Sequence, residues 1–125
     1  MTAQGLSFIR QELSDAGINY SFGEWAGTLV YPYFVGDYIE SPVLSEYGES
    51  ECLFTLTGTA DGSRLSLERV KEKIMNVFPD MGRLHTFEDG NAIAVFYSDA
   101  FYIPTGTVKY KRMQINLKVK EWSVI

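Results

Sequence analysis

The chain has one cysteine and one histidine among its 125 residues. The single cysteine, Cys52, excludes a disulfide within the chain and a zinc site built from several cysteines. His85 is the only histidine available for a Ser-His-Asp or Cys-His arrangement, and no Gly-x-Ser-x-Gly elbow accompanies it. We therefore expect no enzymatic activity, no metal and no cofactor.

Long apolar runs are also missing. No stretch reaches the roughly 18 apolar residues that a membrane span needs, and the first residues lack the basic start and apolar core of a secretory signal. We expect no membrane contact and a protein that is made and kept in the cytoplasm of its host. A length of 125 residues predicts a single domain, 1–125.

Basic residues are scarce in the first half of the chain. Residues 1–62 hold Arg10 alone against nine acidic residues, a balance of −8, whereas residues 63–125 hold ten basic against seven acidic ones, a balance of +3. Such a chain can join copies of itself, acidic surface against basic surface. Alternatively, the fold mixes both halves on every face, and the sequence leaves both arrangements open.

Two segments have helical periodicity. Residues 4–16 carry an apolar stripe and are followed by Gly17, which is suited to the position after a helix. The second segment follows a turn at residues 61–63. In it we expect Ser66 to be the N-cap, Leu65 and Val70 to form a hydrophobic staple, and Pro79 to end the helix. Its expected buried stripe is Leu67, Val70, Ile74, Val77 and Phe78.

Strand patterns fill most of the remainder. Residues 29–38 are rich in strand formers but contain Pro32, which predicts an edge strand or a broken strand. Residues 51–59 alternate, with Cys52, Phe54 and Leu56 pointing inward. Residues 84–88 and 92–97 flank Asp-Gly-Asn and predict a hairpin. A turn at 98–99 would lead into a short strand at 101–103; residues 18–22 form a short strand or an extended lead-in, and residues 41–50 form a loop.

The last long run, residues 107–122, alternates strictly from Met113 onward. Because the earlier apolar residues Val108 and Tyr110 have the opposite parity, we expect a β-bulge or bend near Lys111 and Arg112. The predicted order is α-β-β-α-β-β-β. It favours an α+β fold, with one mostly antiparallel, twisted sheet of four to five strands and both helices packed on one face.

Two groups of side chains are candidates for contact with a partner. The aromatic stretch 25–38 lies beside the proline-broken edge, where exposed rings indicate protein contact or sugar stacking; the alternative is that Phe34 and half of the tyrosines are core residues. The last strand is basic and contains a tyrosine, a pattern that also suits a nucleic-acid backbone, but the acidity of the whole chain argues against nucleic acid. Residues 58–64 are similar to an anion-binding loop but lack its lysine, so we predict a turn and a helix cap.

Four segments of the sequence point to a family. They are residues 31–38 (Tyr-Pro-Tyr-Phe-Val-Gly-Asp-Tyr), 54–59, 71–79 and 114–122. Together they resemble small proteins encoded among the tail-assembly genes of prophages in Gram-positive bacteria. Length and element order are similar to the tail terminator, or tail-completion, proteins of long-tailed phages. Those proteins are α+β domains that form a six-membered ring on the tail tube and join it to the neck.

The resemblance implies a non-enzymatic virion protein that acts by ring formation. Its partners would be further copies of itself, the tail tube and neck proteins, and it would pass from the host cytoplasm into the virion tail. No catalytic residue comes with this family. From their chemistry, the expected contact residues are Tyr31, Tyr33, Tyr38, Glu46, Glu49, Glu51, Lys109, Lys111, Lys118 and Lys120. The alternative function is a stand-alone binding module that holds a small ligand or carbohydrate on its aromatic edge.

Overall fold

The computed structural model describes residues 1–40 and 48–124. Six strands form one sheet in the order β1-β2-β3-β6-β5-β4, in which β1 and β2 are parallel and all other neighbours are antiparallel. The elements are α1 (Ala3–Asp15), β1 (Tyr20–Phe22), β2 (Tyr33–Glu40), β3 (Glu49–Asp61), α2 (Arg64–Val77), β4 (Arg83–Thr86), β5 (Ala92–Ile103) and β6 (Tyr110–Trp122).

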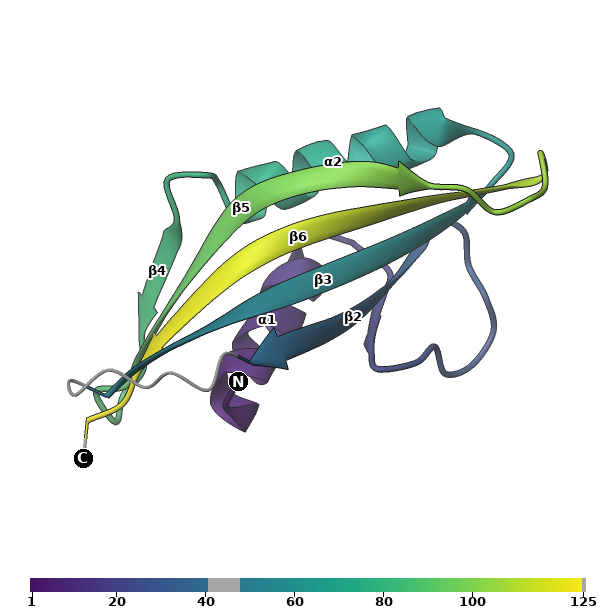
Figure 1. Cartoon of the computed structure of the whole chain (residues 1–125). Coiled ribbons are helices and arrows are strands. Elements are labelled where there is room, and N and C mark those ends of the chain that lie inside the picture. The colour runs from purple at the N-terminus through teal and green to yellow at the C-terminus, as the bar shows by residue number, and fades with distance from the viewer. Residues whose placement is uncertain (41–47, 125) are drawn as a thin grey trace.

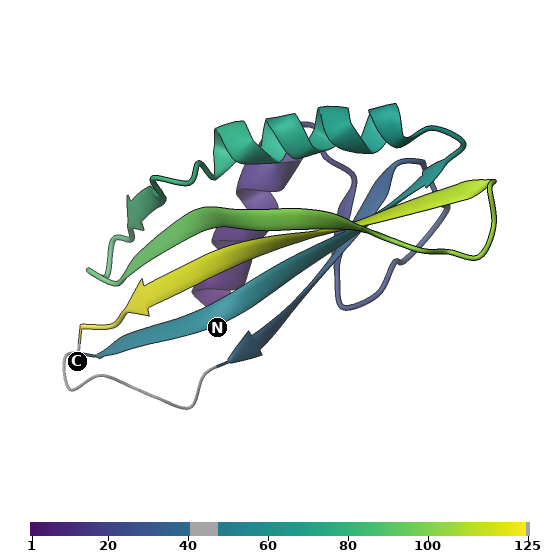
Figure 2. The same cartoon turned by 45° about the horizontal axis from the view of Figure 1, so that its top comes forward.

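The sheet is curled, and both helices lie on one of its faces (Figures 1 and 2). Between helices and sheet lies the core, which α1 enters with Ile9 and Leu13 and α2 with Leu67 and Ile74. The α+β class and the two helices are confirmed. The prediction of four to five strands was too low, because residues 20–22 do form a strand and pair with residues 34–36 of β2.

Helix α1 matches its predicted range to within one residue at each end. Thr2 is its N-cap, and the hydroxyl of Thr2 accepts a hydrogen bond of 2.9 Å from the backbone N–H of Gly5. After the helix, Gly17 has φ of +76°, a left-handed conformation that glycine adopts without steric cost.

The predicted cap of α2 was wrong. Ser63, not Ser66, is the N-cap, and its hydroxyl accepts a 3.1 Å hydrogen bond from the N–H of Leu65. Leu65 is 56% exposed, so the hydrophobic staple is absent. Ser63 and Ser66 fit the cap pattern equally well in the sequence, and the glycine turn at Gly62, with φ of +95°, places the earlier serine at the helix start.

The bulge lies in β5, not in β6. Strand β6 pairs with β3 without a register shift, whereas the register of β5 on β6 shifts between Tyr97 and Asp99. The prediction failed because Val108 belongs to the loop before β6 and is 87% exposed, so its parity carries no information about the strand. The bulge also lets β5 run on to Ile103, so the predicted turn at 98–99 and the separate strand at 101–103 do not exist.

Glycines let large rings lie flat across the sheet. Gly58 pairs with Phe34 across β3 and β2, and a Cβ on Gly58 would lie 2.3 Å from the Phe34 ring. A Cβ on Gly36 would lie 2.6 Å from the Tyr20 ring. Phe34 is completely buried, as the core alternative for residues 25–38 expected. Pro32 precedes β2, so it removes no ladder hydrogen bond and β2 pairs on both sides.

Candidate assembly surface

The opposite face of the sheet carries no helix of the described chain. In Figure 1 this face points toward the viewer, with α1 behind it. Side chains alternate along each strand, so the residues between the core positions of β2, β3, β5 and β6 form this open face. The open face includes Tyr33, Asp37, Ile39, Glu49, Glu51, Leu53, Phe96, Phe101, Tyr110, Arg112, Lys118 and Lys120.

Ion pairs join the acidic and basic halves of the chain across this face. The ammonium of Lys118 lies 3.0 Å from a carboxylate oxygen of Glu51, and that of Lys120 lies 3.8 Å from one of Glu49. Both pairs connect β6 to β3 diagonally. The structure therefore brings these four predicted contact residues together within one copy. On this face acidic and basic residues are mixed, because β3 comes from the acidic first half of the sequence and β6 from the basic second half. This is the second of the two arrangements that the charge distribution left open.

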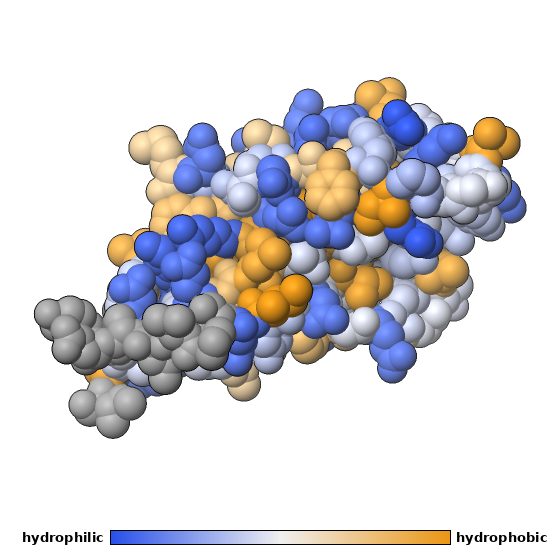
Figure 3. Space-filling view, viewed as in Figure 1, coloured by the Kyte–Doolittle hydropathy of each residue, from blue (hydrophilic) through white to orange (hydrophobic). Residues whose placement is uncertain are grey.

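Apolar side chains occupy the space between the charges. Ile39 on β2 pairs with Leu53 on β3, and these residues are 69% and 39% exposed. Phe101 on β5 is 48% exposed. Figure 3 shows this side of the molecule, with apolar patches separated by hydrophilic ones. A mixed surface of this kind is typical of protein interfaces.

The edges of the sheet are protected where a second chain would add a strand. β1 covers only residues 34–36 of β2, and beyond them the carboxylate of Asp37 accepts a 2.8 Å hydrogen bond from the backbone N–H of Tyr38. On the other side β4 covers only residues 83–86 against 92–95, and the bulge between Tyr97 and Asp99 follows. Bulges and edge carboxylates both oppose strand addition.

Four aromatic side chains gather at one end of the open face. The ring centroids of Trp25 and Tyr33 lie 5.2 Å apart, those of Tyr31 and Tyr33 5.5 Å, and those of Tyr31 and Tyr110 5.9 Å. Loss of water contact, followed by a hydrogen bond with Tyr110, raises the pKa of Tyr31. The predicted contact residues Tyr31 and Tyr33 thus meet in one cluster, to which Tyr110 adds a ring from β6.

Tyr38 lies elsewhere. It is on the helix face of β2, where its ring stacks on Phe22 with the centroids 5.9 Å apart. Lys109 and Lys111 lie at the end of β6 far from Lys118, and a hydrogen bond to Tyr110 raises the pKa of Lys109. Glu46 lies outside the described residues. The ten predicted contact residues are therefore distributed over several surfaces.

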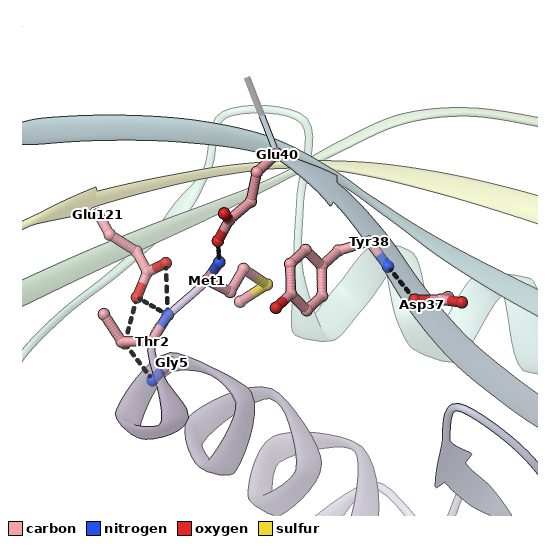
Figure 4. Close-up of polar contacts among 7 residues, drawn as sticks. All are labelled: Met1, Thr2, Gly5, Asp37, Tyr38, Glu40 and Glu121. Atoms are coloured by element: carbon pink, nitrogen blue, oxygen red, sulfur yellow. Dashed lines mark hydrogen bonds and ion pairs between the residues drawn. The ribbon is translucent and has the colours of Figure 1, made fainter. Parts of the chain in front are cut away.

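Glu121 is a buried carboxylate that the sequence analysis missed. It is 6% exposed and lies beneath the start of α1, where its two oxygens accept hydrogen bonds of 3.2 and 3.3 Å from the N–H of Thr2 (Figure 4). The hydroxyl of Thr2 also donates to it. The available signal was that position 121 continues the apolar row 113, 115, 117 and 119. Its role is structural, because it holds the helix start to β6.

His85 contributes packing in this fold. Its ring stacks on Phe8 with the centroids 4.7 Å apart and meets the edge of Phe87 at 4.8 Å. Within the described residues, no group of three or more His, Cys, Asp or Glu side chains is arranged to hold a metal ion. In the same part of the chain, no helix is long and apolar enough to cross a membrane.

Comparison with known proteins gives a fold relationship. No family model matches the chain, and no curated protein does. Eleven chains of known structure match. One of them aligns over 100% of this chain and 99% of its own, with a TM-score of 0.72 and 17% sequence identity, and its name states no function. At that identity the similarity concerns the fold alone.

Proposed function

We propose that this chain is a non-enzymatic structural protein of a phage or prophage virion, a tail terminator or neck–tail connector that acts by forming a ring on the tail tube. The observation that carries the proposal is the open face of the sheet, on which Ile39, Leu53 and Phe101 are exposed between ion pairs. The resemblance of four sequence segments (31–38, 54–59, 71–79 and 114–122) to tail-assembly proteins supplies the biological context.

A ring of identical copies needs two different contact surfaces on each copy. The open face supplies the first. The hairpin between β5 and β6 extends beyond α2 in Figure 1 and supplies the second surface, to which the exposed side chains of Val108 and Lys109 belong. Since Asp37 and the β5 bulge oppose strand addition, the copies meet face to side rather than by extending one sheet.

The ion pairs of the open face bear on which side chains stabilise the contact between neighbouring copies. Lys118 and Glu51 are paired within one copy, so they contribute to the shape and polarity of the surface more than to attraction between copies. The exposed apolar side chains supply the favourable free energy when a neighbouring copy covers them. The expected interface therefore depends weakly on salt concentration.

The test is the absolute mass of the purified chain by light scattering over a range of concentrations, with negative-stain images of large species. We expect rings of about six copies, as the resemblance implies. A single copy at every concentration, together with no binding to isolated tail tubes, would contradict the proposal.

A second candidate is a carbohydrate-binding module, favoured by the half-exposed cluster of Trp25, Tyr31, Tyr33 and Tyr110. Sugars stack on such rings. Titration with a panel of sugars, followed by tryptophan fluorescence, tests it. A Tyr33→Ala variant should abolish any response that arises in the cluster.

A further inference from the structure

A hollow opens on the open face at its β5 edge, with a volume of about 260 Å³. Three segments line it: Phe96, Tyr97 and Ser98 on β5, Lys118 and Lys120 on β6, and Asp80 in the turn between α2 and β4. Across the sheet, Phe96 lies opposite Lys118, which lies opposite Leu53. Leu53 in turn pairs with Ile39. The hollow therefore lies in the same row of the sheet as the exposed apolar pair and continues the proposed contact surface.

The turn at residues 79–82 forms an ordered wall of this hollow. The carbonyl of Pro79 accepts hydrogen bonds from the N–H of Gly82 at 2.9 Å and from the N–H of Tyr97 at 3.2 Å, so the turn is tied to β5. Gly82 has φ of +96°, and a Cβ there would lie 2.3 Å from the ring of Phe96. The ring thus packs on bare backbone, and this close approach holds Asp80 beside the hollow.

The hollow carries one acidic side chain without an ion pair. Lys118 and Lys120 are paired with Glu51 and Glu49 on β3, which balances their charge. Asp80 is exposed, and among the described residues no cation lies within ion-pair distance of it. A partner that fits this hollow should therefore bring a positive charge together with an apolar side chain.

The tip of the β5–β6 hairpin has this combination. Residues 104–109, Pro-Thr-Gly-Thr-Val-Lys, contain no acidic side chain. Lys109 is exposed and forms no ion pair in the described part of the chain. The hydroxyl of Thr105 donates to the carbonyls of Thr107 and Tyr110 at 2.9 and 2.8 Å. Because these bonds order the tip, little conformational entropy is lost when it binds.

The turn at residues 79–82 and the hairpin tip have complementary chemistry. Met81 and Val108 are the most exposed large apolar side chains of the described chain, at 88% and 87%. Met81 follows Asp80, and Val108 precedes Lys109. Each segment thus offers one apolar side chain beside one charge, and the two charges are opposite. Burial of both apolar side chains in a contact between copies is favourable, whereas a single copy leaves them in water.

One copy cannot bring these two segments together. In Figure 1 the turn between α2 and β4 lies toward one end of the sheet and the hairpin toward the other. Between Lys118 at the hollow and Arg112 near the hairpin, β6 spans roughly 20 Å. The two surfaces are therefore separate as well as different. This is what a head-to-tail contact that repeats around a ring requires.

We propose that the tip of the β5–β6 hairpin of one copy binds in the hollow of the next copy; this inference rests on the ring formation proposed above. Val108 packs against Phe96 and Met81 of the neighbour, and Lys109 pairs with Asp80 of the neighbour. A hollow of about 260 Å³ has room for the side chain of Val108. The occupant is thus a second copy of this chain.

Charge exchange tests the ion pair between copies. Lys109→Glu and Asp80→Lys should each weaken assembly about tenfold in light scattering, because each places like charges in the contact. The double variant should assemble like the original chain, since it restores the pair with the opposite polarity. Matched controls are Lys73→Glu and Glu72→Lys, which make the same changes at exposed positions of α2 and should leave assembly unchanged.

Disulfide cross-linking tests the position of Val108. One chain carries Val108→Cys and a second carries Met81→Cys; equal amounts are mixed and oxidised with copper phenanthroline. The native Cys52 is buried and does not compete. We expect a linked pair that contains one of each chain, and little linkage when either chain is oxidised alone, since the contact joins two different surfaces. In the control, Met75→Cys, at an exposed position of α2, replaces Met81→Cys.

The outcomes separate this contact from ring formation itself. Rings that form without recovery in the double charge variant, or with equal cross-linking of Met75→Cys and Met81→Cys, overturn the contact and leave ring formation standing. A preferred cross-link between chains that never close into rings supports the contact and overturns the ring. The absence of both assembly and a preferred cross-link overturns both proposals.

Discussion

The apolar pair on the open face provides the strongest test of ring formation. Ile39 and Leu53 pair across β2 and β3 and are 69% and 39% exposed. We expect the double variant Ile39→Lys/Leu53→Lys to lose assembly while its free energy of unfolding stays within about 0.5 kcal/mol of the original, because exposed substitutions rarely change stability more.

The magnitude follows from the exposed area. With roughly 180 Å² per fully exposed side chain, the two exposed fractions correspond to about 200 Å², which is worth about 5 kcal/mol if a neighbouring copy covers all of it. Covering half of that area gives about 2.5 kcal/mol, or roughly a 70-fold weaker contact when it is lost. Light scattering should then show the shift from ring to monomer displaced to correspondingly higher concentration.

The control variant carries the same two changes to lysine on the exposed surface of α2. Leu65 and Met75 on α2 are 56% and 40% exposed, a close match to the test pair. Leu65→Lys/Met75→Lys should assemble like the original chain. Equal loss in both variants would mean that general surface polarity controls assembly. Unchanged assembly of Ile39→Lys/Leu53→Lys would refute the role of the open face.

Three further predictions concern single contacts. Glu51→Lys should lower the free energy of unfolding by about 0.5–1 kcal/mol through repulsion with Lys118, and added Lys118→Glu should recover it in urea denaturation; no recovery would contradict the ion pair. Gly58→Ala should cost about 1–3 kcal/mol, and less in a Phe34→Leu background, because its methyl group meets that ring; additive costs would show that the two do not touch. Burial raises the pKa of Cys52 to about 11, so at pH 8 iodoacetamide should alkylate the folded chain at least about 100-fold more slowly than the chain in urea; equal rates would indicate an accessible thiol.

Local patterns in the sequence predicted most elements because each rested on burial of one face. Met113, Ile115 and Leu117 are buried, as their alternation predicted, and the hairpin around residues 89–91 is present. The errors concerned where a strand begins and where a bulge interrupts it. Val108 suggested a bulge only as long as it was assumed to lie in the strand, and the boundary of β6 is set by pairing with β3, which is a long-range property.

The contact residues were harder to predict than the elements. The sequence identified Lys118 and Glu51 as charged and exposed, but their mutual distance of 3.0 Å depends on which strand lies next to β6. Strand order cannot be obtained from alternation alone.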